Sequence, residues 1–312
     1  MSKTIPKIIT IVGPTASGKT ALSIVLAQKF SGEIISVDSR QIYKDMDIGT
    51  AKIEGETKVD ENGQVYVLAE GIPHYGLDLI DSSEIFSVAE FKDYTLKRIA
   101  EILQRGHVPF LVGGTGFYTQ AIVENLLIPQ LAPNLALREK LEKKDLAELV
   151  NQLKELDAVS ADKIDLKNKR RVARALEVVL STGKSFAGNW QKGEKQFEVL
   201  SLGITQPREI LYQRIDDRVE EQIKQGLIEE TKKIVEKWHK WSLPSMTGIG
   251  YKEIGMFLRG EVSLERAKEL IKFRTHDYAR RQLTWFKKDK NIHWVTEQFA
   301  AEKLVQNFLK NR

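Results

Sequence analysis

The chain of 312 residues contains no cysteine, five histidines and eight prolines. The absence of cysteine excludes disulfide bonds and thiolate metal sites, and the histidines are scattered without metal-ligand spacing. No run of about 18 apolar residues is present, so we expect neither a transmembrane helix nor a membrane partner. The N-terminus enters a strand pattern within about seven residues, which predicts no secretory signal peptide.

The residues that are present are ordinary for a globular protein. The hydrophobic content is 42% and the charged content is 29%, both close to the averages of soluble domains. The length allows one large domain or two smaller ones. A net charge of +5 is compatible with simple solubility or with a polyanionic partner, so the position of the cations matters more than their sum.

The most specific local pattern is the segment 13–20, which reads GPTASGKT and follows the apolar run Ile8–Val12. A strand, a G-x-x-x-x-G-K-T loop and a helix in this order are typical of a P-loop. Its backbone N–H groups can point at phosphate oxygens, and the helix N-terminus adds positive potential. Lys19 supplies a mobile charge, and the hydroxyl of Thr20 can hold Mg²⁺. The sequence therefore predicts a di- or triphosphate site.

Two further strand ends are expected to face the same crevice. Glu33–Asp38 reads as a strand that ends on a carboxylate, for which a catalytic or metal role is favoured over simple helix capping. Val108–Val112 reads as a buried parallel strand and leads into Gly113–Gly116. Its glycines would let the backbone approach a ligand, although Gly-Gly turns also occur for steric reasons alone. Thr115 offers a hydroxyl group there.

A small surface hairpin is predicted between these strands, at residues 53–72, because Asn62-Gly63 is a strong two-residue turn signal. His74 follows it and could contact a phosphate or a base, or could be purely structural. Ser87–Glu90 is a capping box that opens a helix running to about Gln104.

The middle of the chain changes character. Residues 134–160 are rich in Leu, Lys and Glu with helical spacing, which predicts a helical insertion. Six cations then fall within twelve residues: Lys163, Lys167, Lys169, Arg170, Arg171 and Arg174. They lie on or before a helix whose expected apolar side is Val172, Leu176, Val179 and Leu180. The cations form either a solvated face or a contact with a phosphate backbone.

The last third of the chain returns to the sheet and then becomes helical. Glu198–Thr205 reads as a strand, and Arg214 and Arg218 lie on one face of the helix after it. These arginines could close over phosphates or form surface ion pairs. A long final helix over 263–288 carries a stripe of Arg274, Tyr278, Arg281 and Trp285. Cations beside aromatics suit RNA, whereas an amphipathic helix docked on the core is the alternative, and both can hold at once.

Taken together, six segments resemble the tRNA dimethylallyltransferase family, also called isopentenyl-diphosphate:tRNA transferases. They are, in family order, GPTASGKT at 13–20, ISVDSRQIYKDMDIGTAK at 35–52, LVGGTGFY at 111–118, KRRVARALEV at 169–178, TGIGYKE at 247–253 and YARRQLTWF at 278–286. We therefore expect an α/β fold with a P-loop NTPase-like, three-layer core around a parallel sheet, a helical insertion domain and a helical C-terminal region. The expected division is 1–130 for the first part of the core, 131–190 for a tRNA-contacting insertion, and 191–312 for the rest.

The resemblance implies transfer of a dimethylallyl group from dimethylallyl diphosphate to N6 of adenine 37, next to the anticodon of tRNA. Asp38 would be the general base, Thr115 would orient the adenine amine or Asp38, and Arg218 would stabilise the departing diphosphate. Mg²⁺ is the expected cofactor, with Thr20 and Asp38 as candidate ligands. The partners would be tRNA and dimethylallyl diphosphate, with the enzyme a monomer.

The resemblance also assigns binding residues. Those expected to bind the diphosphate are Gly13, Pro14, Thr15, Ala16, Ser17, Gly18, Lys19, Thr20, Arg214 and Arg218. Those expected to contact tRNA are Asp38, Ser39, Arg40, Gln41, Thr115, Arg138, Arg170, Arg171, Val172, Ala173, Arg174, Thr247, Gly248, Ile249, Gly250, Tyr251, Lys252, Arg280 and Arg281.

Two features depart from the family pattern. The segment 53–72 is longer than usual, and the chain lacks the C-terminal zinc finger of eukaryotic relatives, which indicates a bacterial-type, cytoplasmic enzyme. A small-molecule P-loop kinase is the alternative function, but it would leave the basic and aromatic C-terminal helix without a purpose. A non-catalytic RNA-binding module would leave the P-loop and Asp38 unexplained. P-loops often bind ATP, yet the implied reaction needs none.

Overall fold

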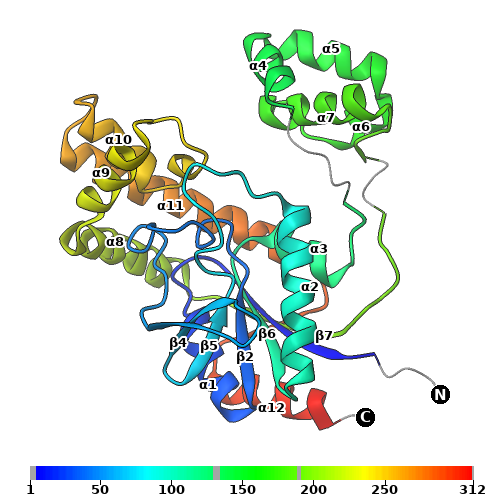
Figure 1. Cartoon of the computed structure of the whole chain (residues 1–312), viewed down its shortest axis with the longest axis vertical. Coiled ribbons are helices and arrows are strands. Elements are labelled where there is room, and N and C mark those ends of the chain that lie inside the picture. The colour runs from blue at the N-terminus through cyan, green and yellow to red at the C-terminus, as the bar shows by residue number, and fades with distance from the viewer. Residues whose placement is uncertain (1–4, 129–133, 188–190, 311–312) are drawn as a thin grey trace. The chain divides into compact units, whose positions relative to one another are not determined.

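The computed structural model describes residues 5–128, 134–187 and 191–310. The chain divides into two compact units (Figure 1). The core unit comprises Met1–Ser87, Phe91–Val123 and Gln196–Arg312, and the helical unit comprises Val88–Glu90 and Glu124–Lys195. The expected boundaries at 130/131 and 190/191 fall at residues that lie, at least in part, outside the described ranges.

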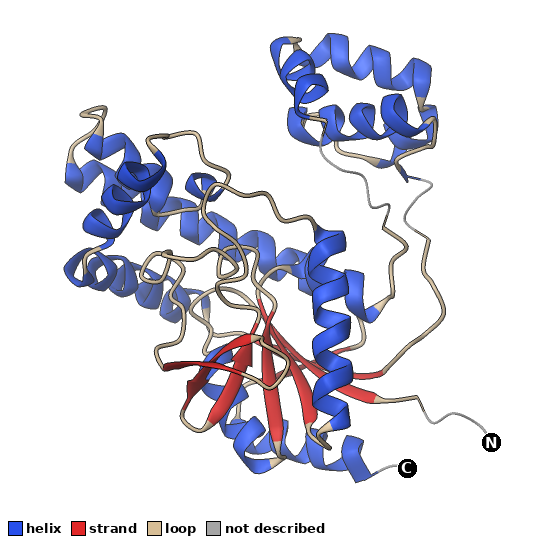
Figure 2. Ribbon diagram, in the orientation of Figure 1, coloured by secondary structure: helices blue, strands red, loops and turns tan. Residues whose placement is uncertain are grey.

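In the described residues the core unit is built on an eight-stranded sheet of order β3-β4-β5-β2-β6-β1-β7-β8 (Figure 2). The strands are β1 Lys7–Val12, β2 Gly32–Ser36, β3 Glu56–Val59, β4 Val65–Ala69, β5 Ile72–Tyr75, β6 Val108–Gly113, β7 Glu198–Ile204 and β8 Ile292–Val295. All neighbouring pairs from β5 to β8 are parallel, whereas β3, β4 and β5 pair antiparallel. The ends of β1, β2 and β6, which the sequence placed at one crevice, are therefore adjacent in the sheet.

Both faces of this sheet are covered. Ile9 and Ile11 of β1 belong to a hydrophobic cluster with side chains of α1 (Lys19–Lys29) and α12 (Gln298–Lys310). Because alternate strand residues point to opposite faces, Ile8 and Val12 face the other side, and both are also buried. A parallel sheet buried on both faces gives the expected three-layer α/β core.

The predicted hairpin at 53–72 is confirmed, with Asn62-Gly63 at its turn, between β3 and β4. It is more than a surface attachment, because β4 also pairs with β5 and so extends the main sheet. His74 lies in β5, is 3% exposed and hydrogen-bonds the carbonyl of Ile72. The structural role of this histidine is therefore the correct alternative, and burial lowers its pKa.

The remaining helices that lie wholly or mostly in the core unit are α2 Val88–Gln104, α3 Gly116–Val123, α8 Arg208–Gln225, α9 Leu227–Trp238, the 3₁₀ turn η2 Ser245–Thr247, α10 Tyr251–Leu258 and α11 Leu264–Phe286. The helices expected up to about Gln104 and over 263–288 are α2 and α11, whereas α3 was not predicted. The strand β8 was not predicted, since four residues of the type Ile-His-Trp-Val give no clear period. None of the described helices is both long and apolar enough to cross a bilayer.

The helical unit contains α4 Leu135–Lys143, α5 Leu146–Leu156, α6 Ala158–Lys163 and α7 Lys169–Thr182. Leu149 and Leu153 of α5 pack against Val172 and Leu176 of α7. The prediction that Leu180 belongs to this apolar side is wrong, because 44% of its surface is exposed. Glu177 is completely buried instead, and that needs the ion pairs described below.

Candidate active site

The P-loop joins β1 to α1 and has the backbone that its glycines predict. Gly13 has a φ of 149°, and a Cβ there would lie 2.2 Å from the carbonyl oxygen of Ile204 in β7. Gly18 has a φ of 99° directly before α1. The Oγ of Ser17 is buried and has no hydrogen-bond partner among the described residues. Since buried polar atoms are normally paired, this hydroxyl fits a ligand seated in the loop.

The ammonium of Lys19 lies across the same loop, where its Nζ donates to the carbonyl of Pro14 at 2.6 Å. The pKa of Lys19 is lowered to about 8, chiefly by burial; the charge of Asp38 opposes this shift, and the charge of Arg218 adds a smaller contribution to it. Three charged groups from α1, α8 and the loop after β2 are thus close enough to influence one another.

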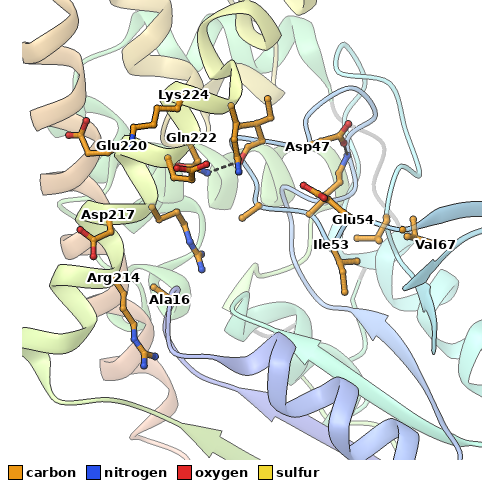
Figure 3. Close-up of a pocket in the computed structure, with 18 of the residues that line it drawn as sticks. Ala16, Asp47, Ile53, Glu54, Val67, Arg214, Asp217, Glu220, Gln222 and Lys224 are labelled. Atoms are coloured by element: carbon orange, nitrogen blue, oxygen red, sulfur yellow. Dashed lines mark hydrogen bonds and ion pairs between the residues drawn. The ribbon is translucent and has the colours of Figure 1, made fainter. Parts of the chain in front are cut away.

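Arg214 and Arg218 of α8 line a large pocket of about 1070 Å³ together with Ala16 and Gly18 of the P-loop. Figure 3 shows Ala16 of the loop and Arg214 bordering the same space. Desolvation by the surrounding protein lowers the pKa of Arg218, although solvent still reaches the residue. Among the described residues, no carboxylate lies within ion-pair distance of either arginine. Two unpaired guanidinium groups beside a P-loop have the charge and the donors that an anion-binding site needs.

A second, smaller pocket of about 350 Å³ is also lined by Arg218, and it is lined by Asp38, the predicted general base. Asp38, Thr15 and Arg218 line it together with Tyr278 and Arg281 of α11. Asp38 lies two residues beyond β2, and its Oδ1 accepts from the backbone N–H of Arg40 at 2.8 Å. The capping alternative thus applies to a turn rather than to a helix. No described residue hydrogen-bonds to the Oδ2 atom.

Thr115 and Tyr278 complete this group. The Oγ1 of Thr115 accepts from the backbone N–H of Ser39 at 3.1 Å. Burial raises the pKa of Tyr278 to about 12, with a further contribution from the charge of Asp38, and the contact with Thr115 acts in the opposite direction. The loops after β2 and β6 and the helix α11 therefore bring their polar side chains to one point.

Of the other residues of the core unit that were predicted to contact tRNA, some line the small pocket and others support its walls. Thr247, Gly248 and Ile249 line the small pocket. Tyr251, in contrast, is 1% exposed, and its hydroxyl donates to the Oε1 of Glu230 at 2.6 Å. The Nε2 of Gln41 donates to the carbonyl of Thr50 at 3.2 Å, so it holds together two parts of the connection between β2 and β3.

The cation stripe of α11 is only partly available for a ligand. Arg274 forms an ion pair with the buried Glu253, and Arg280 forms one with Asp277 on the same helix. Arg281 has no carboxylate partner among the described residues and lines the small pocket. The docked-helix alternative therefore describes Arg274, and the ligand-facing interpretation fits Arg281.

The predicted cations of the helical unit divide in the same way. Arg138 and Arg174 donate to the buried carboxylate of Glu177 at 2.9 Å and 2.6 Å. Burial raises the pKa of Glu177, but these hydrogen bonds outweigh it and the pKa is lowered overall. Arg170 and Arg171 are exposed at the start of α7. Within their own unit, they are the arginines of this helix that remain open to a partner.

Two supporting residues were missed by the sequence analysis. Glu230 of α9 accepts from the backbone N–H groups of Asp47, Ile48 and Gly49 at 2.9, 2.9 and 3.1 Å, which fixes the loop between the two pockets. Gln282 of α11 hydrogen-bonds the P-loop. No local pattern marks Glu230, whereas Gln282 stands inside the segment YARRQLTWF and could have been noticed there.

A metal ion would have few protein ligands at this site. Among the described residues, no group of three or more His, Asp or Glu side chains is arranged to hold one. Thr20 is exposed at the first turn of α1. Mg²⁺ in phosphate sites commonly takes one or two protein oxygens together with water and phosphate oxygens. The predicted ligands Thr20 and Asp38 would fit such an ion.

The comparisons with known proteins agree with this geometry. Residues 41–289 match the family model described as IPP transferase. The tRNA dimethylallyltransferase of Acetivibrio thermocellus is 43% identical over 309 residues, which cover 96% of this chain and 95% of the relative.

Two solved structures are similar over almost the whole chain. The tRNA isopentenylpyrophosphate transferase from Bacillus halodurans has a TM-score of 0.69 at 37% identity and covers 97% of this chain and 95% of its own. A eukaryotic dimethylallyltransferase acting on tRNA has a TM-score of 0.77 at 31% identity, with 98% of this chain and 80% of that one covered. The expected fold and resemblance are confirmed, and the chain belongs to the IPP transferase family.

Proposed function

We propose that the chain transfers the dimethylallyl group of dimethylallyl diphosphate to N6 of adenine 37 in tRNA and releases diphosphate. The observation that carries the proposal is that Arg218 lines both the phosphate-binding pocket and the pocket of the predicted general base. This arginine lines the pocket of the P-loop and also the pocket that contains Asp38. An anion cradle on one side and a carboxylate on the other are what an alkyl transfer from a diphosphate to a weak amine requires.

The cradle side would stabilise the leaving group. Breaking the allylic C–O bond places negative charge on the diphosphate and positive charge on the allyl carbon. Lys19, the P-loop amides, Arg214 and Arg218 would stabilise that negative charge. Mg²⁺ bound at Thr20 and the diphosphate oxygens would neutralise part of the same charge.

The carboxylate side would accept the proton of the nucleophile. The exocyclic amine of adenine must lose a proton as its bond to the allyl carbon forms, and a positioned base typically contributes about 10²- to 10⁴-fold. Asp38 is held through Oδ1, and its Oδ2 has no hydrogen-bond partner among the described residues. We assign Asp38 as the general base and Thr20 as the metal ligand. Thr115 and Tyr278 would orient the incoming adenine beside Asp38.

The RNA side of the proposal uses the exposed cations. The adenine must leave the anticodon-loop stack to reach Asp38, as in other enzymes that modify bases. We propose that Arg281, an exposed residue that lines the small pocket, contacts the RNA backbone together with Arg170 and Arg171 of α7.

The test is transfer of label from dimethylallyl diphosphate into unmodified tRNA with Mg²⁺ and without ATP. Incorporation supports the proposal, whereas no incorporation, together with ATP consumption in a parallel reaction that contains ATP, would favour the kinase. Asp38→Asn is expected to lose at least about 10²-fold in turnover while retaining tRNA affinity. Asp289→Asn is the matched control, since Asp289 also accepts a backbone N–H two residues along, at 2.9 Å, but lies in an exposed turn. Normal turnover by Asp38→Asn would remove this residue from the base role.

A further inference from the structure

The helix α11 contacts the P-loop at two places, although about 265 residues separate them along the chain. Ala279 packs in one hydrophobic cluster with Ala16. One turn further, the Oε1 of Gln282 accepts from the backbone N–H of Thr15 at 2.8 Å. The first half of the phosphate-binding loop therefore rests on α11.

The same side chain also binds the turn after β6. The Nε2 of Gln282 donates to the carbonyl of Gly114 at 2.9 Å, and the residue is only 6% exposed. Its amide thus bridges the loop after β1 and the loop after β6, and both of its polar atoms are used. Buried amide groups in such a bridge are costly to leave unpaired.

The turn after β6 is shaped to receive α11. A Cβ on Gly114 would lie 2.2 Å from the Nε2 of Gln282, and a Cβ on Gly116 would lie 2.2 Å from the Cδ1 of Trp285. These two glycines therefore admit side chains of α11. These glycines could serve close approach of a ligand or close packing of the chain, and the structure supports close packing.

The neighbouring side chains of α11 face the small pocket. Tyr278 and Arg281 line it beside Asp38. The helix consequently presents one set of side chains to the proposed RNA site and, through Gln282, holds a P-loop amide. We propose that Gln282 is a positioning residue, which fixes the P-loop backbone at Thr15 and so shapes the neighbouring diphosphate cradle, and which couples that cradle to RNA contacts on α11. The inference rests on the proposed function for the identity of the two ligands.

Direct binding measurements test this without turnover. Inorganic pyrophosphate is titrated into the full chain with and without an unmodified anticodon stem-loop RNA. Gln282→Met has a similar volume but can neither accept from Thr15 nor donate to Gly114. We expect pyrophosphate affinity to fall by up to roughly tenfold, because ordering the loop on binding would cost at most about the free energy of the lost buried hydrogen bond. The effect of RNA on that affinity is expected to shrink toward none, while affinity for RNA alone changes less than about twofold.

Gln213→Met is the matched control. Gln213 lies on the exposed side of α8, where its Nε2 donates to Asp217 at 2.8 Å, and both affinities should equal those of the unaltered chain. Gln282→Glu serves if the methionine variant does not fold. It keeps an acceptor for the Thr15 amide but loses the donor and adds negative charge, so pyrophosphate affinity should fall and RNA affinity should persist.

The outcomes separate the two proposals. Unchanged pyrophosphate affinity and unchanged coupling in Gln282→Met would overturn the positioning role. An equal loss of both ligands in the glutamate variant would do the same, because it would indicate general destabilisation. A failure of prenyl transfer in the unaltered chain would remove the proposed function and leave these binding results standing as a property of the P-loop.

Discussion

The ammonium of Lys19 makes diphosphate affinity depend on pH in the neutral to alkaline range. Burial lowers its pKa in the free protein to about 8, against the opposing charge of Asp38 and with a smaller contribution from Arg218. A diphosphate bound against Lys19 would favour the charged form and raise that pKa. Binding energy is therefore fully present below the free pKa and is lost as the pH rises above it, because the protein must then take up a proton in order to bind.

The expected magnitude follows from the free pKa of about 8. The protonated fraction falls from about nine-tenths at pH 7 to about one-tenth at pH 9, so affinity should fall roughly tenfold, or about 1.4 kcal/mol. Isothermal titration with inorganic pyrophosphate between about pH 6.5 and 9.5 measures it. Lys19→Arg is the matched control, because a guanidinium stays charged throughout and its profile reports the titration of the ligand itself.

Two neighbours should move the inflection in opposite directions. Arg218→Gln removes a positive charge that lowers the pKa of Lys19, so the inflection should move to higher pH. Asp38→Asn removes a negative charge that raises it, so the inflection should move to lower pH. If the profile of the unaltered chain coincides with that of Lys19→Arg, Lys19 does not titrate in this range and the reasoning is refuted.

Three further predictions concern groups around the site. Arg281→Ala should weaken tRNA binding and reduce the slope of log affinity against log salt by about one, whereas Arg280→Ala should change it less, because this cation is already paired with an aspartate of the same helix. Filter binding over a salt series separates them, and equal effects would contradict the distinction. Glu230→Gln removes the negative charge of a carboxylate that accepts hydrogen bonds from three backbone N–H groups. It should lower the free energy of unfolding, measured by urea titration, by about 2 kcal/mol, whereas the control Glu229→Gln, at an exposed position, should leave it unchanged. Glu177→Gln leaves two arginines without a counter-charge and should destabilise the helical unit by about 3 kcal/mol, seen as loss of hydrogen-exchange protection confined to 134–187.

The sequence predicted those parts of the site whose chemistry is carried by consecutive residues. The P-loop is complete within 13–20, and the strand before Gly113 is a single apolar run. The Asn62-Gly63 turn is likewise local, since two residues set its backbone. Parallel strands buried on both faces give continuous apolar runs, which made the central strands visible and the short edge strand β8 invisible.

Partners far along the chain could not be predicted in this way. Helical spacing placed Arg274 and Arg281 on one stripe, but spacing does not say that Glu253 meets only the first of them. A helical wheel also assigned Leu180 to the buried side of α7, although Glu177 occupies the interior. A buried carboxylate is tolerated only because Arg138 and Arg174 neutralise it, and the pairing of these helices is a tertiary contact.

The glycines after β6 show how a correct motif can have a different physical cause. A Cβ on Gly113 would lie 2.0 Å from the carbonyl oxygen of Val37, and Val37 directly precedes Asp38. Gly114 and Gly116 leave the space that the side chains of Gln282 and Trp285 of α11 occupy. The motif is thus required by packing between segments distant in sequence. Through that packing, the carboxylate at 38, the P-loop amide of Thr15 and the pocket-lining face of α11 acquire fixed positions relative to one another.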